Sequence, residues 1–294
     1  MPNSFICGLS LLILSIILFP STANTEDTPD YYSPENVLKF ANYLYEQGDY
    51  LRAVNEYQRY LYYQPKDSNQ IQYRIALCYR LGGKPELAIQ IFRSFLGKSD
   101  DHELISNSYY QIGASYFLME NYEKTVSYFS TFLQHIRDNR LRAESHQLIG
   151  LSLLKQKEWL EAEKSFKLLL NSDIVEVSKI AEVYHEFALG GRQLPTRSPL
   201  FAGFFSTILP GAGRVYTGRI GDALNSVFII GISGWQAYDG FQRDGLSSIK
   251  GWTLGTICGI FYVGNIYGSV VSARVFNDRI ADEYLTTLYI ELPY

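Results

Sequence analysis

The sequence predicts an all-α fold, in which a solenoid of paired helices precedes a hairpin of transmembrane helices. Three observations lead to this fold class. A pattern of small and aromatic residues recurs four times within 34–172, and long, nearly uncharged apolar segments follow after residue 200. A glycine-rich segment, 210–219, marks the entry to these apolar segments. We therefore expect a helical array over 34–190, a linker over 191–199, a membrane module over 200–276 and a carboxyl-terminal tail over 277–294.

The amino terminus has the composition of an export signal. Residues 5–19 are almost wholly apolar, and small residues follow at Ser21 and Ala23. This pattern predicts a signal peptide, 1–23, that is cleaved after Ala23. The alternative is an uncleaved membrane anchor, because no Lys or Arg precedes the apolar run. An exported amino terminus would place the array outside the cytoplasm, in the periplasm of a bacterial cell.

The array is predicted from an internal repeat. Small residues recur at intervals of 35, 37 and 37 residues, at Ala41, Ala76, Gly113 and Gly150. Sixteen residues after each of them an aromatic residue recurs, at Tyr57, Phe92, Phe129 and Phe166. Each unit reads as two amphipathic helices, in which the small residue allows a close crossing and the aromatic fills the gap towards the next unit. This pattern resembles the tetratricopeptide repeat (TPR).

A further amphipathic helix is expected over 174–189. Stacked arrays need a terminal element that covers the exposed end of the last repeat, and this helix is placed to do so. Gly190 and Gly191 are expected to end it.

The TPR resemblance implies that the first helix of each unit lines a concave groove. On the family's pattern the groove positions are Asn42, Tyr45, Tyr73, Arg80, Tyr110, Phe117, Gln147 and Lys155. Tyrosine combines apolar contact area with a hydroxyl group, so such a groove suits an extended peptide or a helix of a protein partner. The alternative is that some of these side chains simply pack between neighbouring helices.

The last third of the chain predicts contact with membrane lipid. Segments 200–213, 221–241 and 250–273 are mainly apolar, and the last of them is long enough to cross a bilayer with some tilt. Glycines on this last segment recur at the G-x-x-x-G spacing that lets membrane helices approach closely, at Gly251, Gly255, Gly259, Gly264 and Gly268. They predict helix packing, and with it a homo-oligomer. The alternative is a buried helical hairpin in a soluble domain.

Segment 210–219 reads P-G-x-G-x-x-Y-x-G-R and is expected to form a turn. Its motif residues are Pro210, Gly211, Gly213, Tyr216, Gly218 and Arg219, followed by Asp222. The motif resembles two-transmembrane-helix domains and uncharacterised bacterial membrane modules, some of which follow TPRs, and the resemblance implies membrane embedding. Arg219 is expected to pair with Asp222 at the entry of the first apolar helix.

The arginines of the apolar third bear on topology. Arg214 and Arg219 precede the first long apolar segment, and Arg274 and Arg279 follow the second. The positive-inside rule therefore places the array side of the module in the cytoplasm. This conflicts with an exported array unless 200–213 crosses or re-enters the membrane.

The sequence carries no motif for catalysis or cofactor binding. The four histidines are isolated, and no H-E-x-x-H, G-x-S-x-G or phosphate-loop pattern is present. Gly211-x-Gly213 departs from a dinucleotide loop because Tyr216 stands where a glycine is needed and no strand precedes it. No run of Lys and Arg indicates nucleic acid. No enzyme activity, cofactor or metal is expected.

These observations together predict a non-enzymatic, membrane-anchored TPR scaffold that binds a protein partner in bacterial envelope assembly or secretion. The alternative is an oligomeric channel or translocation component in which the array is regulatory.

Overall fold

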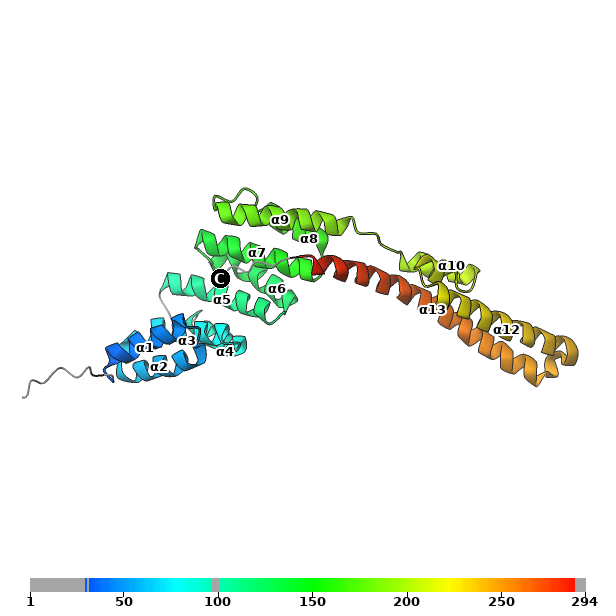
Figure 1. Cartoon of the computed structure of the whole chain (residues 1–294), viewed down its shortest axis with the longest axis horizontal. Coiled ribbons are helices and arrows are strands. Elements are labelled where there is room, and N and C mark those ends of the chain that lie inside the picture. The colour runs from blue at the N-terminus through cyan, green and yellow to red at the C-terminus, as the bar shows by residue number, and fades with distance from the viewer. Residues whose placement is uncertain (1–29, 31, 97–100, 289–294) are drawn as a thin grey trace, which may run out of the picture.

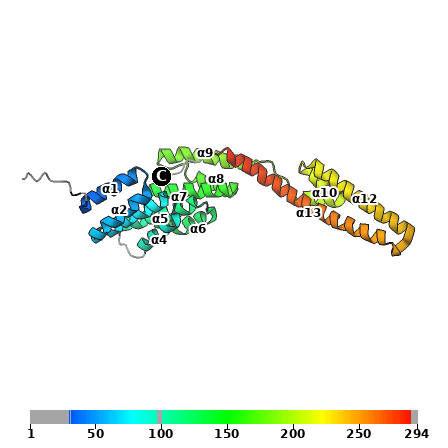
Figure 2. The same cartoon turned by 60° about the horizontal axis from the view of Figure 1, so that its bottom comes forward.

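The computed structural model describes residues 30, 32–96 and 101–288, and every regular element in these ranges is a helix. The molecule is elongated, with an array of short helices at one end and two long helices that extend from it as a rod (Figure 1). The same two parts remain distinct when the molecule is turned (Figure 2). The predicted signal peptide, 1–23, lies outside the described residues.

The array consists of four helix pairs and a final single helix. The pairs are α1 (Pro34–Glu46) with α2 (Tyr50–Tyr63), α3 (Ser68–Leu81) with α4 (Pro85–Leu96), α5 (His102–Leu118) with α6 (Tyr122–Phe132), and α7 (Asn139–Lys155) with α8 (Trp159–Lys167). The single helix is α9 (Val175–Arg192), and short 3₁₀ turns follow two of the pairs at Pro65–Asp67 and Leu133–His135. Each sequence repeat therefore folds as two helices, as predicted.

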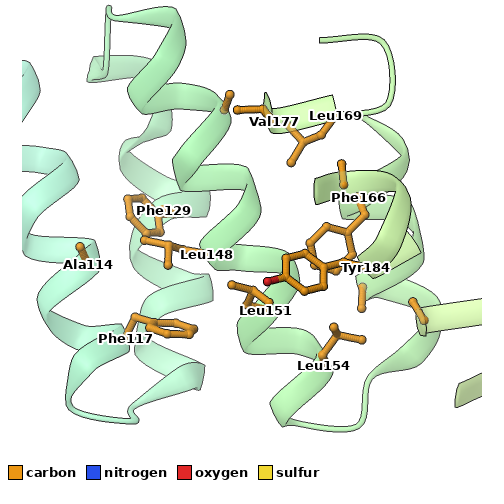
Figure 3. Close-up of a cluster of buried hydrophobic side chains, with 14 of the residues drawn as sticks. Ala114, Phe117, Phe129, Leu148, Leu151, Leu154, Phe166, Leu169, Val177 and Tyr184 are labelled. Atoms are coloured by element: carbon orange, nitrogen blue, oxygen red, sulfur yellow. The ribbon is translucent and has the colours of Figure 1, made fainter. Parts of the chain in front are cut away.

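The repeated small and aromatic residues pack against each other as expected. Phe129 and Phe166 are fully buried, and each faces the glycine of its own repeat. A Cβ atom on Gly113 would lie 2.2 Å from the Phe129 ring, and one on Gly150 would lie 2.5 Å from the Phe166 ring. Figure 3 shows both phenylalanines within the continuous core formed by the last two repeats and α9. The aromatic ring thus occupies the space that the missing side chain leaves.

The second repeat buries the only cysteine of the described array. Cys78 lies on α3 with no exposed surface, and this burial raises the pKa of its thiol to about 12. Because the thiolate is the reactive species, we expect a maleimide to label Cys78 at pH 8 only after the array unfolds. Mass spectrometry after timed labelling, with and without denaturant, measures this. Rapid labelling of the native protein would show that the second repeat opens readily.

The structure corrects the predicted end of α9. The helix continues through Gly190 and Gly191 to Arg192 instead of ending at the glycines. The reason is that both glycines provide room for an aromatic ring. A Cβ atom on Gly191 would lie 2.4 Å from Trp159, and one on Gly190 would lie 2.2 Å from the Tyr284 hydroxyl. These glycines allow close packing and do not terminate the helix.

The apolar third folds into four helices. They are α10 (Pro199–Ile208), α11 (Ala212–Tyr216), α12 (Ile220–Asp244) and α13 (Ile249–Thr286), with a 3₁₀ turn at Gly245–Ser247 between the last two. The helices α12 and α13 pack side by side as an antiparallel hairpin (Figure 1). We call these four helices the apolar module, and we call the turn between α12 and α13 the hairpin tip.

Helices α10 and α11 fold back on each other. The Ser198 amide, at the start of α10, donates a hydrogen bond to the Tyr216 hydroxyl at the end of α11, over 3.2 Å. Both ends of this segment therefore lie at the same end of the apolar module. The bend at Pro210 follows the end of α10, as predicted, but 212–216 form a short helix within the segment that was expected to be a turn.

Helix α13 is longer than the sequence suggested. It continues beyond Ala273 to Thr286, so most of the described part of the predicted tail is helical. Its last turns return to the array, where the Tyr284 ring stacks on Phe187 at 4.2 Å and contacts Trp159. The Tyr284 hydroxyl also donates to the Phe187 carbonyl oxygen over 2.9 Å. The array and the apolar module are thus joined twice, by the chain at 193–198 and by this contact.

Candidate functional site

The first helices of three successive repeats form a cleft of about 400 Å³. We call it the repeat groove. Its lining residues come from α1, α3, α5 and the residue before α5: Tyr45, Gln70, Tyr73, Arg74, Leu77, Asp101, Glu103, Leu104 and Asn107. The walls combine two tyrosines and two leucines with charged and amide side chains. Such a mixture suits a partner segment that has both apolar and polar groups.

Contacts within the array fix the positions of Arg74 and Tyr45, which line the groove, and of Asn42, which Arg74 contacts. The Tyr57 hydroxyl donates to the Asn42 Oδ1 atom over 2.7 Å, so Asn42 is held from the second helix of its own repeat. Arg74 donates to the same oxygen over 3.4 Å and thereby links the first two repeats. The ring of Tyr45 packs edge-on against Tyr50 at 5.6 Å. This end of the groove is therefore ordered before any partner binds, which reduces the entropy cost of binding.

The half-buried cation of Arg80 lies close to the two groove tyrosines, Tyr45 and Tyr73. Burial lowers the pKa of Arg80, and the surrounding residues Tyr110, Tyr73 and Tyr45 oppose that effect. Burial raises the pKa of Tyr73 to about 12, so its hydroxyl is neutral at physiological pH. The Nε atom of Arg80 is buried and has no hydrogen-bond partner. The positive charge of Arg80 therefore lies next to the groove tyrosines, and the hydroxyl groups of these tyrosines compensate only part of its burial.

Three of the eight predicted groove residues are buried in the structure, which places them in the packing alternative. Tyr110 and Phe117 belong to the core of the last two repeats, and Gln147 is equally inaccessible. Burial raises the pKa of Tyr110, and the buried Glu144 carboxylate, which accepts a hydrogen bond from the Tyr110 hydroxyl, raises it further. A partner cannot reach these side chains. Asn42, Tyr45, Tyr73, Arg80 and Lys155 remain partly exposed, and of these Tyr45 and Tyr73 line the groove.

The sequence reasoning missed several residues of the groove. Gln70 and Arg74 lie on α3 together with Tyr73, and Glu103 and Asn107 lie near the start of α5. Their helical spacing of i, i+3 and i+4 from Gln70 was the available signal, because residues so spaced share one face of a helix.

The motif residues of 210–219 hold the base of the apolar module together. The Gly211 amide donates to Asn265 Oδ1 over 3.1 Å, and the Gly213 amide donates to Ser206 Oγ over 3.0 Å. Ser206 Oγ in turn donates to Ser269 Oγ over 2.7 Å. These bonds satisfy polar groups that are buried in apolar surroundings, where an unpaired amide is costly. The motif therefore fastens the short helices α10 and α11 to α13.

The charged residues at the entry of α12 pair as predicted. Arg219 forms an ion pair with Asp222, three residues later, and also donates to Ser272 Oγ on α13 over 3.3 Å. Gly218 occupies the left-handed backbone region, with φ of 79°, which lets the chain turn from α11 into α12. Tyr216 contacts the guanidinium of Arg197 as well as the Ser198 amide.

The glycines of α13 have different surroundings. Gly251 and Gly255 face α12, since Cβ atoms there would lie 2.7 Å from Phe241 and 3.8 Å from Ala237. Gly268 faces Arg214, with only 2.7 Å between a built Cβ and the guanidinium. A Cβ atom built on Gly259 or on Gly264 would meet no neighbouring atom within 4 Å. Only the first two glycines therefore serve the packing of α12 on α13.

The apolar module exposes large apolar side chains along its length. On α10 they include Leu200 and Ile208, and on α12 and α13 they include Phe228, Trp235, Ile260 and Tyr267. Among the described residues, one helix, α13, is long and apolar enough to cross a membrane, and 11% of its most apolar window is buried. The helix α12 also exposes large apolar side chains but carries Asp222 and Asp239. Such a continuous apolar surface marks a contact with lipid or protein.

Comparisons with known proteins agree with the repeat pattern. The tetratricopeptide repeat family model matches residues 38–103, so this part of the chain carries TPRs. A crystal structure of the C-terminal part of a TPR repeat-containing protein from Cytophaga hutchinsonii is similar over 78% of this chain and 98% of that one. The two are 15% identical with a TM-score of 0.27, and so weak a likeness carries no argument here. No curated protein matches the sequence.

Proposed function

We propose that this protein is a non-enzymatic scaffold that is anchored in a membrane by its apolar module and binds a protein partner in the repeat groove. TPR domains generally bind protein partners, and the groove supports the same role here because it is open, ordered and lined by three successive repeats. Its tyrosine, arginine and amide groups suit an extended peptide or a helix. The setting that we propose is bacterial envelope assembly or secretion.

The dimensions and surface of the apolar module support membrane anchoring. At 25 residues, α12 is about 37 Å long, which exceeds the roughly 30 Å of the hydrocarbon core. The exposed rings of Tyr238 and Trp252 lie near the hairpin tip, where aromatic residues favour a membrane–water interface. We therefore propose that both α12 and α13 cross the bilayer, so that the array and the hairpin tip lie on opposite sides.

Charge reversal in the groove tests partner binding. Arg74 is exposed on the groove wall, and arginine is common among the residues that dominate binding energies. We expect Arg74→Glu to weaken partner capture about tenfold or more. The measurement is photo-crosslinking in cells from a reactive amino acid at Gln70, with the full-length protein. Arg52→Glu is the matched control, because Arg52 is exposed on α2 and pairs only weakly with Asp49.

A second crosslinking position makes the groove test selective. Tyr62 lies on α2 and is 82% exposed, outside the groove lining. We expect a discrete protein adduct from Gln70 and none from Tyr62. Equal adducts from both positions, or an adduct that Arg74→Glu leaves unchanged, would remove the groove from the proposed function. Alanine substitutions at Tyr110 and Phe117 would test stability instead of binding, because both residues are buried.

Labelling from outside intact cells tests the orientation. The predicted export signal places the array outside, so we expect an impermeant maleimide to modify Gln134→Cys in the array but not Ser247→Cys at the hairpin tip. The background carries Cys258→Ser, and Cys78 is buried. The opposite pattern would place the array in the cytoplasm, as the arginines near its end of the apolar module predict. Labelling of both positions would contradict the proposed membrane crossing.

A further inference from the structure

The apolar module contains a cavity of about 330 Å³ between α11, α12 and α13. We call it the module cavity. Its polar lining is formed by Arg214, Asn225, Ser226 and Asn265, and its apolar lining includes Ile260 and Phe261. Gly264 forms part of the wall, and a Cβ atom there would meet nothing within 4 Å. The volume is at the lower end of the range for small-molecule sites.

Arg214 carries a charge that the protein does not neutralise. Its Nη1 atom donates to the backbone carbonyl oxygen of Asp222 over 3.2 Å, and its Nε atom is buried without a partner. The Asp222 carboxylate pairs with Arg219 instead. Within the described part of the chain, no carboxylate lies within ion-pair distance of Arg214. A cation in apolar surroundings is stabilised by an anion, and arginine suits phosphate because its planar fork can form two hydrogen bonds.

The lining changes from polar to apolar along the axis of the hairpin. Arg214 lies nearest the array, close to Gly268, and Asn225 and Asn265 follow towards the hairpin tip. Ile230 and Ile260 lie closer to the hairpin tip than these two asparagines do. A ligand that matched this order would carry its anionic group at the array side and an apolar chain towards the tip. Inorganic phosphate or a small phosphate ester would match only the first part.

We propose that the module cavity binds an anionic phospholipid, with Arg214 paired to the phosphate and an acyl chain lying along Ile230 and Ile260. Asn225 is exposed at the polar end and is placed to contact the headgroup. Arg219 and Ser272 join α12 to α13 at the array-side end of the hairpin, which is where the phosphates of a surrounding leaflet would lie. This inference rests on the proposed embedding of the apolar module in a membrane.

The test is lipid retention by the full-length protein. Wild-type protein is reconstituted in nanodiscs that contain phosphatidylcholine and phosphatidylglycerol at a ratio of four to one, then released into detergent for native mass spectrometry. We expect retained phosphatidylglycerol on the wild type and a loss of about tenfold with Arg214→Gln. Arg274→Gln is the matched control, since Arg274 is exposed on α13 outside the cavity lining. It should retain phosphatidylglycerol as the wild type does.

A second pair of variants tests the cavity without changing Arg214: one variant fills the cavity and the other is its control. Gly264→Leu places a side chain in the cavity, and Gly259→Leu places the same side chain in open space on the same helix. We expect the first to lose phosphatidylglycerol and the second to keep it. This pair keeps the proposal testable if Arg214→Gln fails to fold, because a Cβ atom on either glycine would meet no neighbouring atom within 4 Å.

Further readouts separate the alternatives. Extraction of membranes with alkaline carbonate reports embedding, so wild-type protein in the soluble fraction would overturn the proposed function and this inference with it. Embedded protein that retains phosphatidylglycerol equally with Arg214→Gln, or equally with Gly264→Leu, would overturn the lipid site alone. A third arm titrates inorganic phosphate into detergent-solubilised protein. Binding of phosphate that depends on Arg214, without lipid retention, would replace the lipid by a soluble phosphate ligand and overturn the proposal.

Discussion

Gly213→Ala is expected to lower the melting temperature of the apolar module by about 12–24 °C. An added Cβ would lie 1.9 Å from the carbonyl oxygen of Ala202 and 2.6 Å from Ser206 Oγ. The first neighbour is backbone of α10 at a buried residue, so it cannot move aside as a flexible side chain would. Overpacking of this kind costs about 3 kcal/mol at the upper end of its usual range.

The cost of Gly213→Ala also includes a hydrogen-bond network. The Gly213 amide and Ser269 share Ser206 Oγ, so displacing Ser206 would leave buried polar groups unpaired. Melting is followed by size-exclusion chromatography after heating in detergent. Gly221→Ala is the matched control, because a Cβ there meets nothing within 4 Å and alanine favours helix by up to about 1 kcal/mol. Equal melting temperatures for the two variants would show that 210–219 is not a fixed turn.

The helical repeats could be predicted because they depend on local and periodic features. A small residue and an aromatic sixteen residues later identify each unit, and the structure shows the two side by side at Gly113 and Phe129. The pairing of Arg219 with Asp222 was predictable for the same reason, since a spacing of three residues places both on one face of a helix.

Features that depend on contacts between distant segments could not be predicted. Gly190 and Gly191 have the composition of a helix end, but the rings that occupy their space come from Tyr284 and Trp159, far away in sequence. Tyr110 is likewise buried in a core that includes residues of the next repeat, where Glu144 hydrogen-bonds its hydroxyl. A single sequence gives the residue types at such positions but not the partner that decides their role.

The carboxyl terminus also departs from the prediction. Residues 277–286 contain several charged residues, including Asp278, Asp282 and Glu283, and lie within the predicted tail, 277–294. They continue α13 because the charges lie on its exposed face, while Tyr284 and Leu285 face the core of the last repeat. Helical spacing of the apolar residues decided the structure of this segment, and its total charge did not.

Tyr284→Ala is expected to release the end of α13 from the array. The substitution removes the stacking on Phe187, the contact with Trp159 and the hydrogen bond to the Phe187 carbonyl oxygen. Truncating a half-buried aromatic residue of this kind costs about 2–4 kcal/mol, near the lower part of the range for buried rings. The remaining ion pairs from Lys157 to Asp278 and Asp282 are too exposed to replace that energy.

Distances between spin labels at Gln134 and Ser247 report the release of α13. We expect one narrow distance distribution in the wild type and a broad one in Tyr284→Ala, because the chain at 193–198 would then be the main connection between the array and the apolar module. Tyr284→Phe keeps the ring and loses about 1 kcal/mol, so it should stay narrow. A narrow distribution in Tyr284→Ala would show that α10 and 193–198 alone fix the two parts. If the array is released while partner capture at Gln70 persists, the α13 contact serves to orient the bound partner relative to the membrane, and the groove needs no membrane module to bind it.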